Sequence, residues 1–274
     1  MTDKYAVVGN PVAHSKSPQI HAAFAAQTGQ AMTYEHVLAP LDGFAATVRD
    51  LIARGFSGIN ATVPFKQEAF AMADNYSQRV LAAGAANTLK FTSIGIEADN
   101  TDGAGLVRDL SRNLRFTLAG SRILLLGAGG AARGVIQPLL DAGAAQLLIA
   151  NRTHARAVEL AARFGFDVEA TLLDLLDAPF DLLINATSTS LSGQRLHLPD
   201  VICGPSTLAY DMMYGKEPTA FMRWASERGA RSSDGLGMLV EQAAASFALW
   251  RGVNPDTAPV LAQLRATRST PKAA

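Results

Sequence analysis

Cysteine, excess charge and long apolar runs are scarce or absent in this chain of 274 residues. With Cys203 as its one cysteine, the chain can form no intramolecular disulfide, thiolate zinc cluster or Cys-x-x-Cys redox pair. Its 24 basic and 24 acidic residues give zero net charge, which disfavours a general nucleic-acid binder, because such a protein needs a basic excess to neutralise phosphates. There is no apolar run of about 18 residues and no signal-peptide pattern at residues 1–9, so we expect a soluble cytoplasmic protein with small-molecule partners.

The remaining composition is that of a folded protein. Hydrophobic residues make up 49% of the chain and charged residues 18%, which excludes a mainly disordered polypeptide. The length corresponds to about two domains. The sequence contains no internal repeat and no low-complexity block, and its composition hardly changes between the two halves.

Short apolar runs alternate with helical stretches along most of the chain. We predict strands at residues 5–8, 33–38, 58–63, 123–126, 146–150, 181–184 and 207–210, and a hairpin at 86–96. Helices are predicted to begin at Ser17, which can cap free N–H groups, and at Asp102, and to cover residues 42–53, 66–73, 237–250 and 255–266. This alternation predicts mainly parallel sheets that are covered by helices on both faces.

A glycine-rich turn at residues 127–130 is the sharpest local signal. It follows a buried strand and opens a helix, which is the context that a dinucleotide-binding loop requires. Gly127 would make the tight turn, Gly129 would let the backbone approach a pyrophosphate, and Ala132 would pack where the helix meets the strand. The alternative is a glycine-rich turn that binds nothing, but the flanking strand and helix favour binding.

The end of the next strand indicates which dinucleotide is bound. An NAD site usually carries Asp or Glu there, to accept a hydrogen bond from the ribose 2′-hydroxyl. Here the strand ends in Asn151, Arg152 and Thr153, with Arg156 one turn later. Guanidinium, hydroxyl and amide groups suit a 2′-phosphate better, so we predict NADP rather than NAD. The alternative is a solvated helix start with Thr153 as its cap.

Four polar motifs lie in the first half of the chain, at residues 9–18, 60–66, 84–88 and 99–103. Loops that follow strand ends in an α/β domain converge on one crevice, so we expect the motifs to form one site. Their candidate binding residues are Ser15, Ser17, Thr62, Lys66, Asn87 and Asp102. Hydroxyl, amide and charged groups of this kind suit a small polyhydroxylated acid. The alternative roles are helix caps for Ser17 and Asp102, and a solvated lysine for Lys66.

The histidines show no metal-binding spacing, so no metal site is predicted. His14 is a weaker alternative as a catalytic base, since it lies within the serine-rich turn.

Together with the segments at 211–214 and 234–242, these motifs closely resemble the shikimate dehydrogenase family, from Tyr5 to about Leu264. The resemblance implies reversible, NADPH-dependent reduction of 3-dehydroshikimate to shikimate, in the biosynthesis of chorismate and the aromatic amino acids. It also implies two α/β domains that flank a cleft. Residues 1–103 with 238–274 would form the substrate-binding domain, a mainly parallel three-layer sandwich to which the C-terminal helices return. Residues 104–237 would form a Rossmann domain for NADP.

The resemblance also assigns roles to particular residues. Lys66 and Asp102 would be the catalytic pair, and it stays open whether Lys66 donates the proton or acts mainly through its charge. The residues implied to bind the substrate carboxylate and hydroxyls are Ser15, Ser17, Thr62, Asn87, Tyr214 and Gln242. Those implied to bind NADP are Gly127, Ala128, Gly129, Gly130, Ala131, Asn151, Arg152, Thr153 and Arg156, with Met212 and Gly235 near the nicotinamide.

Three positions depart from the family pattern. Gln78 stands where relatives often have an acidic residue, Ala86 replaces a usual valine, and Ser190 replaces a common glycine. None of these changes removes a catalytic group. The rival interpretations are an NAD-preferring quinate/shikimate dehydrogenase, a non-catalytic NADP sensor and a methylenetetrahydrofolate dehydrogenase-like enzyme. The absence of an acidic residue at 151–153 disfavours the NAD-preferring enzyme. The presence of Lys66 and Asp102 disfavours the non-catalytic sensor, and the polar motifs disfavour the methylenetetrahydrofolate dehydrogenase-like enzyme. The oligomeric state is left open between monomer and homodimer.

Overall fold

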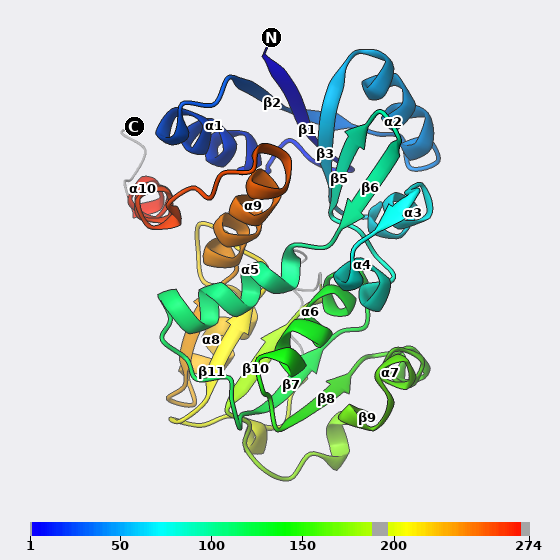
Figure 1. The fold of residues 1–274 in the computed structure, drawn as a ribbon. Helices are drawn as coiled ribbons and strands as arrows, with labels where there is room; N and C mark the ends of the chain where they lie inside the picture. Colours follow the sequence, from blue (N-terminus) through cyan, green and yellow to red (C-terminus); the bar gives the residue numbers. More distant parts are fainter. Residues whose placement is uncertain (1, 188–196, 270–274) are drawn as a thin grey trace. The chain divides into compact units, whose positions relative to one another are not determined.

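The computed structural model describes residues 2–187 and 197–269 (Figure 1). The chain divides into two compact units, one formed by Met1–Gly105 with Leu239–Ala274 and the other by Leu106–Met238. These divisions lie one or two residues from the boundaries at 103/104 and 237/238 that the family resemblance implies. Each unit contains one six-stranded sheet with helices, which confirms the expected α/β fold class.

The sheet of the first unit has the strand order β2-β1-β3-β5-β6-β4. Its strands are β1 (Asp3–Gly9), β2 (Met32–Leu38), β3 (Phe56–Ala61), β4 (Asn75–Tyr76), β5 (Thr88–Thr92) and β6 (Gly95–Asp99). Only β5 runs opposite to the others, because it forms a hairpin with β6 and pairs antiparallel with both neighbours. The sheet is therefore mainly parallel, as the alternation of strands and helices predicts. The short edge strand β4 was not predicted.

Helices cover both faces of this sheet. The first unit contains α1 (Ser17–Thr28), α2 (Phe44–Ala53), α3 (Lys66–Ala71), α4 (Gln78–Ala83), most of α9 (Leu236–Arg251) and α10 (Thr257–Ser269). On one face, the buried side chains of Val8 and Ile59 belong to the same cluster as Val48 of α2. On the other face, Tyr5 stacks on Trp250 of α9, with 4.6 Å between ring centroids. These two apolar layers give the expected three-layer sandwich.

The start of α1 differs from the expectation. Ser17 is the first residue of the helix and does not cap it, since the residue at the cap position is Lys16 and it makes no side-chain cap hydrogen bond. Instead, the Ser17 main-chain N–H donates to the Ser15 hydroxyl oxygen at 3.3 Å. The helix ends at Thr28 and is followed by Gly29, which takes the left-handed conformation at a φ of 65°.

The sheet of the second unit is entirely parallel, with the order β12-β11-β10-β7-β8-β9. Its strands are β7 (Arg122–Leu126), β8 (Gln146–Ala150), β9 (Val168–Thr171), β10 (Leu182–Asn185), β11 (Leu208–Asp211) and β12 (Arg231–Asp234). Counted from β7, this is the order 3-2-1-4-5-6 of the doubly wound dinucleotide-binding fold. The two edge strands β9 and β12 were not predicted, because they are short and only partly apolar.

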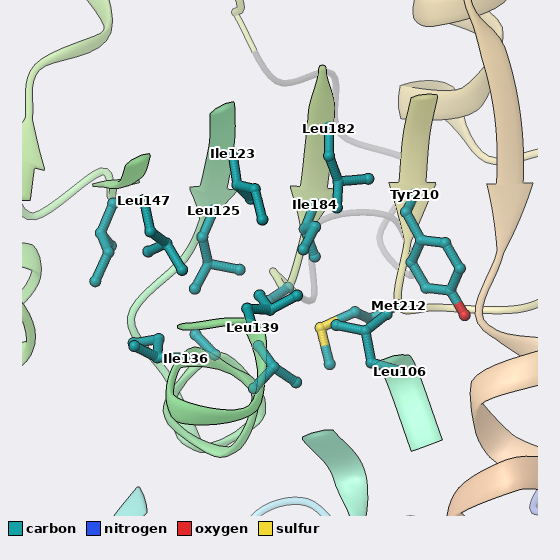
Figure 2. Packing of buried hydrophobic residues seen from close by; sticks show 14 of the residues in the cluster. Leu106, Ile123, Leu125, Ile136, Leu139, Leu147, Leu182, Ile184, Tyr210 and Met212 are labelled. Carbon is teal, nitrogen blue, oxygen red and sulfur yellow. The ribbon is translucent and has the colours of Figure 1, made fainter. Parts of the chain in front are cut away.

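Alternation along β7 shows how both faces of this sheet are buried. Ile123 and Leu125 point towards Ile136 and Leu139 of α6 (Gly130–Asp141) (Figure 2). Leu124, between them, belongs to the cluster on the opposite face. A strand that is buried on both sides reads as a continuous apolar run rather than as an alternating pattern, which is why residues 123–126 are all Ile or Leu.

Among its described residues, the second unit also contains α7 (His154–Ala161), α8 (Ala220–Ser226) and 3₁₀ turns at Ala162–Asp167, Leu173–Leu175 and Asp200–Ile202. The helix α5 (Asp102–Arg108) runs on into a π-helical turn at Asp109–Asn113. The divisions between the two units fall within α5 and α9.

Candidate active site

The four polar motifs of the first unit meet at one edge of its sheet. β1 and β3 are parallel, and Val8 near the end of β1 pairs with Ala61 at the end of β3. The segments that follow the two strands therefore leave the sheet at the same edge. In the β5–β6 hairpin, Thr88 pairs with Asp99, so Asn87 and Asn100 also lie at this edge. The main-chain N–H of Ala61 donates to the Asn87 carbonyl at 2.9 Å and joins the two groups. The strand topology thus brings the expected residues of the first unit to one place.

Lys66 and Asp102 form an ion pair at this edge. Lys66 is the first residue of α3 and Asp102 the first residue of α5, and the Lys66 Nζ donates to Asp102 Oδ2. Their side chains are 15% and 7% exposed, so water screens the charges only weakly. Breaking such a pair would leave an uncompensated charge in a poorly solvated place, which is costly. The arrangement holds an ammonium group where it can donate a hydrogen bond to a ligand oxygen.

Asn87 and Gln242 complete a hydrogen-bonded group around Asp102. Asn87 Nδ2 donates to Asp102 Oδ1 at 2.9 Å and to Gln242 Oε1 at 3.1 Å. Both amide side chains are buried, with residue exposures of 3% and 8%. Gln242 lies on α9, in the part that belongs to the first unit. Two residues that are 155 positions apart in the sequence therefore contact each other directly, as the resemblance implies for a shared site.

Ser15 and Thr62 lie in the loops that follow β1 and β3, and Ser17 is the first residue of α1. The Ser15 hydroxyl donates to the Ser17 hydroxyl at 3.1 Å, and a nitrogen of His36, Nε2, lies 2.9 Å from the Ser15 carbonyl oxygen. Thr62 packs so close to Gly9 that a Cβ at position 9 would lie 2.4 Å from its methyl group. Within the described parts of the chain, no hydrogen bond joins these three residues to Lys66 or Asp102. His14 is exposed.

Several buried or half-buried polar residues at this site were not among the expected binding residues. They are Tyr34, Asn60, Thr88, Thr101 and Ser246, and hydrogen bonds connect all of them. Asn60, Thr88 and Thr101 lie within the polar motifs but were given no role. Ser246 follows Gln242 by four residues on α9, a spacing that places both on one face of the helix and could have identified it.

The glycine loop of the second unit has the geometry of a phosphate-binding turn. Gly127 adopts a φ of +111°, which disfavours any other residue. Gly129 occupies the cap position of α6, where no side chain caps the free N–H groups, and a Cβ added to Gly129 would meet nothing within 4 Å. The open space and the uncapped helix start suit an anion such as a pyrophosphate. Ala132 is fully buried, as expected where helix meets strand.

The segment after β8 provides cationic groups beside this loop. The Gly127 N–H donates to the Ala150 carbonyl at 2.8 Å, which ties the turn to the end of β8. Asn151 Nδ2 donates to the Thr153 carbonyl at 2.9 Å and holds the next turn together. Arg152 and Arg156 are exposed and form no ion pair within the part of the chain that the structure describes. Both guanidinium groups are available to a phosphate.

Met212, Tyr214 and Gly235 follow β11 and β12. Met212 is 8% exposed, and Tyr214 is half-buried. A Cβ at Gly235 would lie only 2.2 Å from the Met212 carbonyl oxygen, so close backbone packing by itself requires glycine there. Gln78 is exposed and Ala86 is buried in the core of the first unit, whereas Ser190 lies outside the described residues. No group of metal-ligating side chains occurs among the residues that the structure describes.

The doubly wound sheet, the glycine loop and the lysine–carboxylate pair define an α/β dinucleotide-binding oxidoreductase. Comparison with known proteins identifies the family. Residues 7–89 match the shikimate dehydrogenase substrate binding domain, residues 109–193 match shikimate/quinate 5-dehydrogenase, and residues 235–265 match the shikimate 5′-dehydrogenase C-terminal domain. The chain belongs to the shikimate dehydrogenase family.

Individual relatives cover nearly the whole chain. It is 58% identical over 269 residues to the shikimate dehydrogenase (NADP(+)) of Herminiimonas arsenicoxydans, covering 97% of this chain and 98% of that protein. Among solved structures, the Ael1 enzyme of Pseudomonas putida is 46% identical, with a TM-score of 0.91 over 96% of this chain and 98% of that one. The shikimate 5-dehydrogenase of Thermus thermophilus, solved in complex with NADP(H) and shikimate, is 33% identical and has a TM-score of 0.88. The match covers 97% of this chain and 99% of that one.

In the described part of the chain, no helix is both long and apolar enough to cross a membrane.

Proposed function

We propose that this chain catalyses the reversible, NADP-dependent interconversion of 3-dehydroshikimate and shikimate in aromatic amino acid biosynthesis, with Lys66 and Asp102 as its catalytic pair. The observation that carries the proposal is the ion pair of Lys66 with Asp102, held among buried amides at the sheet edge. The names of the relatives, which include an NADP(+)-dependent shikimate dehydrogenase that is 58% identical, support the same reaction.

The residues of the glycine loop and of the segment after β8 fit NADP. The uncapped start of α6 and the open space at Gly129 would receive the pyrophosphate, and Arg152 and Arg156 would pair with a 2′-phosphate. Asn151 and Thr153 would shape the turn between these groups. We place Met212 and Gly235 near the nicotinamide, in line with the family resemblance. NADPH, when bound, supplies the hydride for reduction of the ketone.

Lys66 serves the oxygen of the reacting carbonyl. Reduction of a ketone adds a hydride to carbon and a proton to oxygen, so negative charge develops on that oxygen as the reaction proceeds. An ammonium within hydrogen-bond distance stabilises the charge and can supply the proton. Asp102 accepts a hydrogen bond from Lys66 Nζ and thereby limits the directions in which the remaining N–H groups point. The pair is thus oriented before the substrate binds, which reduces the entropy cost of the reaction.

The polar side chains around the pair suit a hydroxylated carboxylic acid. We assign the carboxylate and hydroxyl groups of the substrate to Ser15, Ser17, Thr62, Gln242 and Tyr214, with Asn87 in the same site. Ser15 and Ser17 bond to each other, so their two hydroxyl groups lie together where one ligand could reach both. We also propose that the enzyme is cytoplasmic. Its one cysteine, Cys203, is a buried free thiol, so the fold does not depend on a disulfide that would need an oxidising compartment.

A spectrophotometric assay tests the proposal. Purified enzyme is offered shikimate or quinate, each with NADP⁺ or NAD⁺, and the absorbance of the reduced nicotinamide is followed. We expect shikimate with NADP⁺ to give by far the highest kcat/KM. Absence of turnover with this pair of substrates would refute the proposed reaction.

The role of Lys66 is tested by Lys66→Ala, with Lys4→Ala as its control. Lys4 is an exposed residue at the start of β1, at the opposite end of that strand from the site. We expect Lys66→Ala to lower kcat by about a hundredfold or more, within the range typical of general acid–base catalysis, and Lys4→Ala to leave kcat unchanged. If kcat of Lys66→Ala stays within a few-fold of the wild-type value and only KM rises, Lys66 is a binding group and the proton comes from elsewhere.

A further inference from the structure

One peptide unit of the segment before β5 lies between the main chain of Lys66 and that of Asp102. Lys66 and Asp102 begin different helices, α3 and α5, and are 36 positions apart in the sequence. The N–H of Ala86 donates to the Lys66 carbonyl oxygen at 2.8 Å. The carbonyl of the same peptide unit belongs to Ala85, and it accepts from Asn100 Nδ2 at 2.8 Å. Because a peptide unit is planar and rigid, these two bonds hold their partners at a fixed separation.

The side chain of Asn100 completes the connection to Asp102. Asn100 Oδ1 accepts from the main-chain N–H of Asp102 at 3.1 Å. This N–H lies at the start of α5, where main-chain N–H groups have no partner within the helix itself. A continuous path of hydrogen bonds therefore connects the two ends of the ion pair. We call it the backbone bridge, and its members are Lys66, Ala85, Ala86, Asn100 and Asp102.

The Asn100 amide can take only one orientation in this bridge. A main-chain carbonyl can only accept and a main-chain N–H can only donate, so the atom that faces Ala85 is the nitrogen and the atom that faces Asp102 is the oxygen. A flipped amide would place oxygen against the carbonyl and nitrogen against the N–H, and would lose both bonds. The main chain at its two ends thus fixes this side chain.

The middle of the backbone bridge is buried. Asn100 is 1% exposed, and Ala85 and Ala86 have no exposed surface. Water cannot replace a lost bond there, and a buried carbonyl or N–H without a partner is costly. These three residues also offer no surface to a ligand in this conformation. They can therefore affect a reaction only through the residues at the two ends of the bridge.

Asp99 fixes the main chain from which the Asn100 side chain projects. Asp99 Oδ1 accepts from the Asn100 main-chain N–H at 2.7 Å, from Ser77 Oγ at 2.8 Å and from Arg79 Nε at 3.0 Å. Its other oxygen, Oδ2, accepts from Arg79 Nη2 at 2.5 Å. The Asp99 residue is 4% exposed, so these bonds are shielded from water. Both the main chain and the side chain of Asn100 are consequently held.

We propose that Asn100 is a positioning residue that fixes, through the backbone bridge, the separation between the main chains of Lys66 and Asp102. The ammonium and the carboxylate project from these two main chains, so their contact depends on that separation. A displacement of about 1 Å at a catalytic group can lower a rate about a hundredfold. The inference deepens the proposed function and rests on it for its kinetic test.

Asn100→Leu tests the bridge by kinetics. Leucine has nearly the same shape as asparagine, adds no charge and can bond neither the Ala85 carbonyl nor the Asp102 N–H. We expect kcat to fall at least tenfold with a smaller change in KM for shikimate, because the bridge acts on the geometry of the catalytic pair. A kcat within about twofold of the wild-type value would overturn the proposal.

Two control variants separate positioning from a general loss of stability. The Gln27 amide makes the same kind of double bond to a main chain, since its Nε2 donates to the Asp256 carbonyl at 3.1 Å and its Oε1 accepts from the Asp256 N–H at 2.7 Å. Gln27 lies near the end of α1 that is remote from Ser17. Gln27→Leu and the core variant Val48→Ala should both keep the wild-type kcat, although Val48→Ala lowers Tm. An equal loss of kcat in Val48→Ala would overturn the proposal.

Asn100→Asp tests the donor bond to Ala85 and is available if Asn100→Leu does not fold. The new carboxyl group can donate to the Ala85 carbonyl only when it is protonated. Burial and the carboxylates of Asp99 and Asp102 favour the protonated form, against the opposing charges of Lys66 and Arg79. We expect kcat of Asn100→Asp, relative to wild type, to rise as the pH falls from about 8.5 to about 6. A ratio that does not change with pH would overturn the role of this bond.

Crystal structures give a readout that does not depend on activity. The wild-type enzyme should show the bonds of Asn100 to Ala85 and Asp102, and Asn100→Leu should lose the contact between Lys66 and Asp102. An unchanged ion pair in Asn100→Leu would overturn the proposal even if kcat falls. Conversely, a wild-type enzyme that has the bridge and the ion pair but does not turn over shikimate would refute the proposed function and leave the bridge standing.

Discussion

His21 makes the first unit sensitive to acid. Its imidazole has no exposed surface, stacks on Tyr34 with 4.2 Å between ring centroids and lies among Phe24, Phe247 and Trp250. Neither ring nitrogen has a hydrogen-bond partner within the described residues. Burial lowers the pKa of His21 from 6.5 to about 3, and the nearby Asn60 side chain opposes this shift only in part. The ring is therefore neutral in the folded protein and becomes protonated mainly when the chain unfolds.

The sign and size of the effect follow from this difference in pKa. Because the folded-state pKa is the lower one, the stabilisation is complete above pH 6.5 and is lost as the pH falls towards 3. Each pH unit below 6.5 costs about 1.4 kcal/mol, so at about pH 4.5 the free energy of unfolding is lower by roughly 3 kcal/mol on account of His21 alone. His21→Phe keeps an aromatic ring in the stack and removes this contribution.

Urea unfolding at about pH 7.5 and pH 4.5 measures the difference. Trp250 lies 5.4 Å from His21 between ring centroids, so its fluorescence reports on the first unit. Trp224 is the other tryptophan, and both proteins would carry Trp224→Phe to remove its signal. We expect the free energy of unfolding to fall less between the two pH values in His21→Phe than in its parent, by roughly 3 kcal/mol.

Parallel losses of stability in the two proteins would refute this reasoning. They would mean that the pKa of His21 is the same in the folded and unfolded states. Full burial of a ring without hydrogen bonds excludes such equality. An NMR titration of the His21 ring gives an independent check, since the folded protein should show no protonation of this ring above about pH 5.

Two further predictions concern the dinucleotide. Arg152→Ala should raise KM for NADPH at least tenfold and KM for NADH only slightly, because the exposed guanidinium would pair with the 2′-phosphate that NADH lacks. Steady-state kinetics with both cofactors measures the two KM values, and equal effects would contradict the NADP assignment. Gly129→Ala should keep the Tm of the wild-type protein, because a Cβ at this position meets nothing within 4 Å. It should nevertheless raise the Kd for NADP⁺, because the added methyl group fills the space beside the loop. An unchanged Kd would show that the pyrophosphate lies elsewhere.

Much of the fold is predictable because its signals are local. The run at 123–126, the glycine turn after it and the helix that follows are contiguous, and each is visible without knowledge of the rest of the chain. The strand at 146–150 was predicted with the bounds of β8. The edge strands β9 and β12 were missed because an edge strand is held by pairing with one neighbour, and Arg231–Asp234 has no apolar pattern of its own.

Some residues of the candidate site could likewise be predicted from local motifs, and others could not. Motifs with a known order predicted Lys66, Asp102, Asn87 and Gln242, and the strand ends explain why the first three lie close together. The buried partners could not be identified in this way, because threonines and serines are common and carry no local signal of a shared hydrogen bond. Ser246 contacts Asn60 across 186 positions of sequence, and only the folded chain shows it.

By itself, the sequence determined the α/β class and the family, and it predicted a dinucleotide loop and a preference for a 2′-phosphate, because each depends on short segments whose residue types suffice. Only the tertiary structure decided which way the Asn100 amide points and that Gly235 is required by close backbone packing. It also decided that His21 is buried without a partner. These properties depend on distances between atoms from distant segments, and no local pattern encodes such distances.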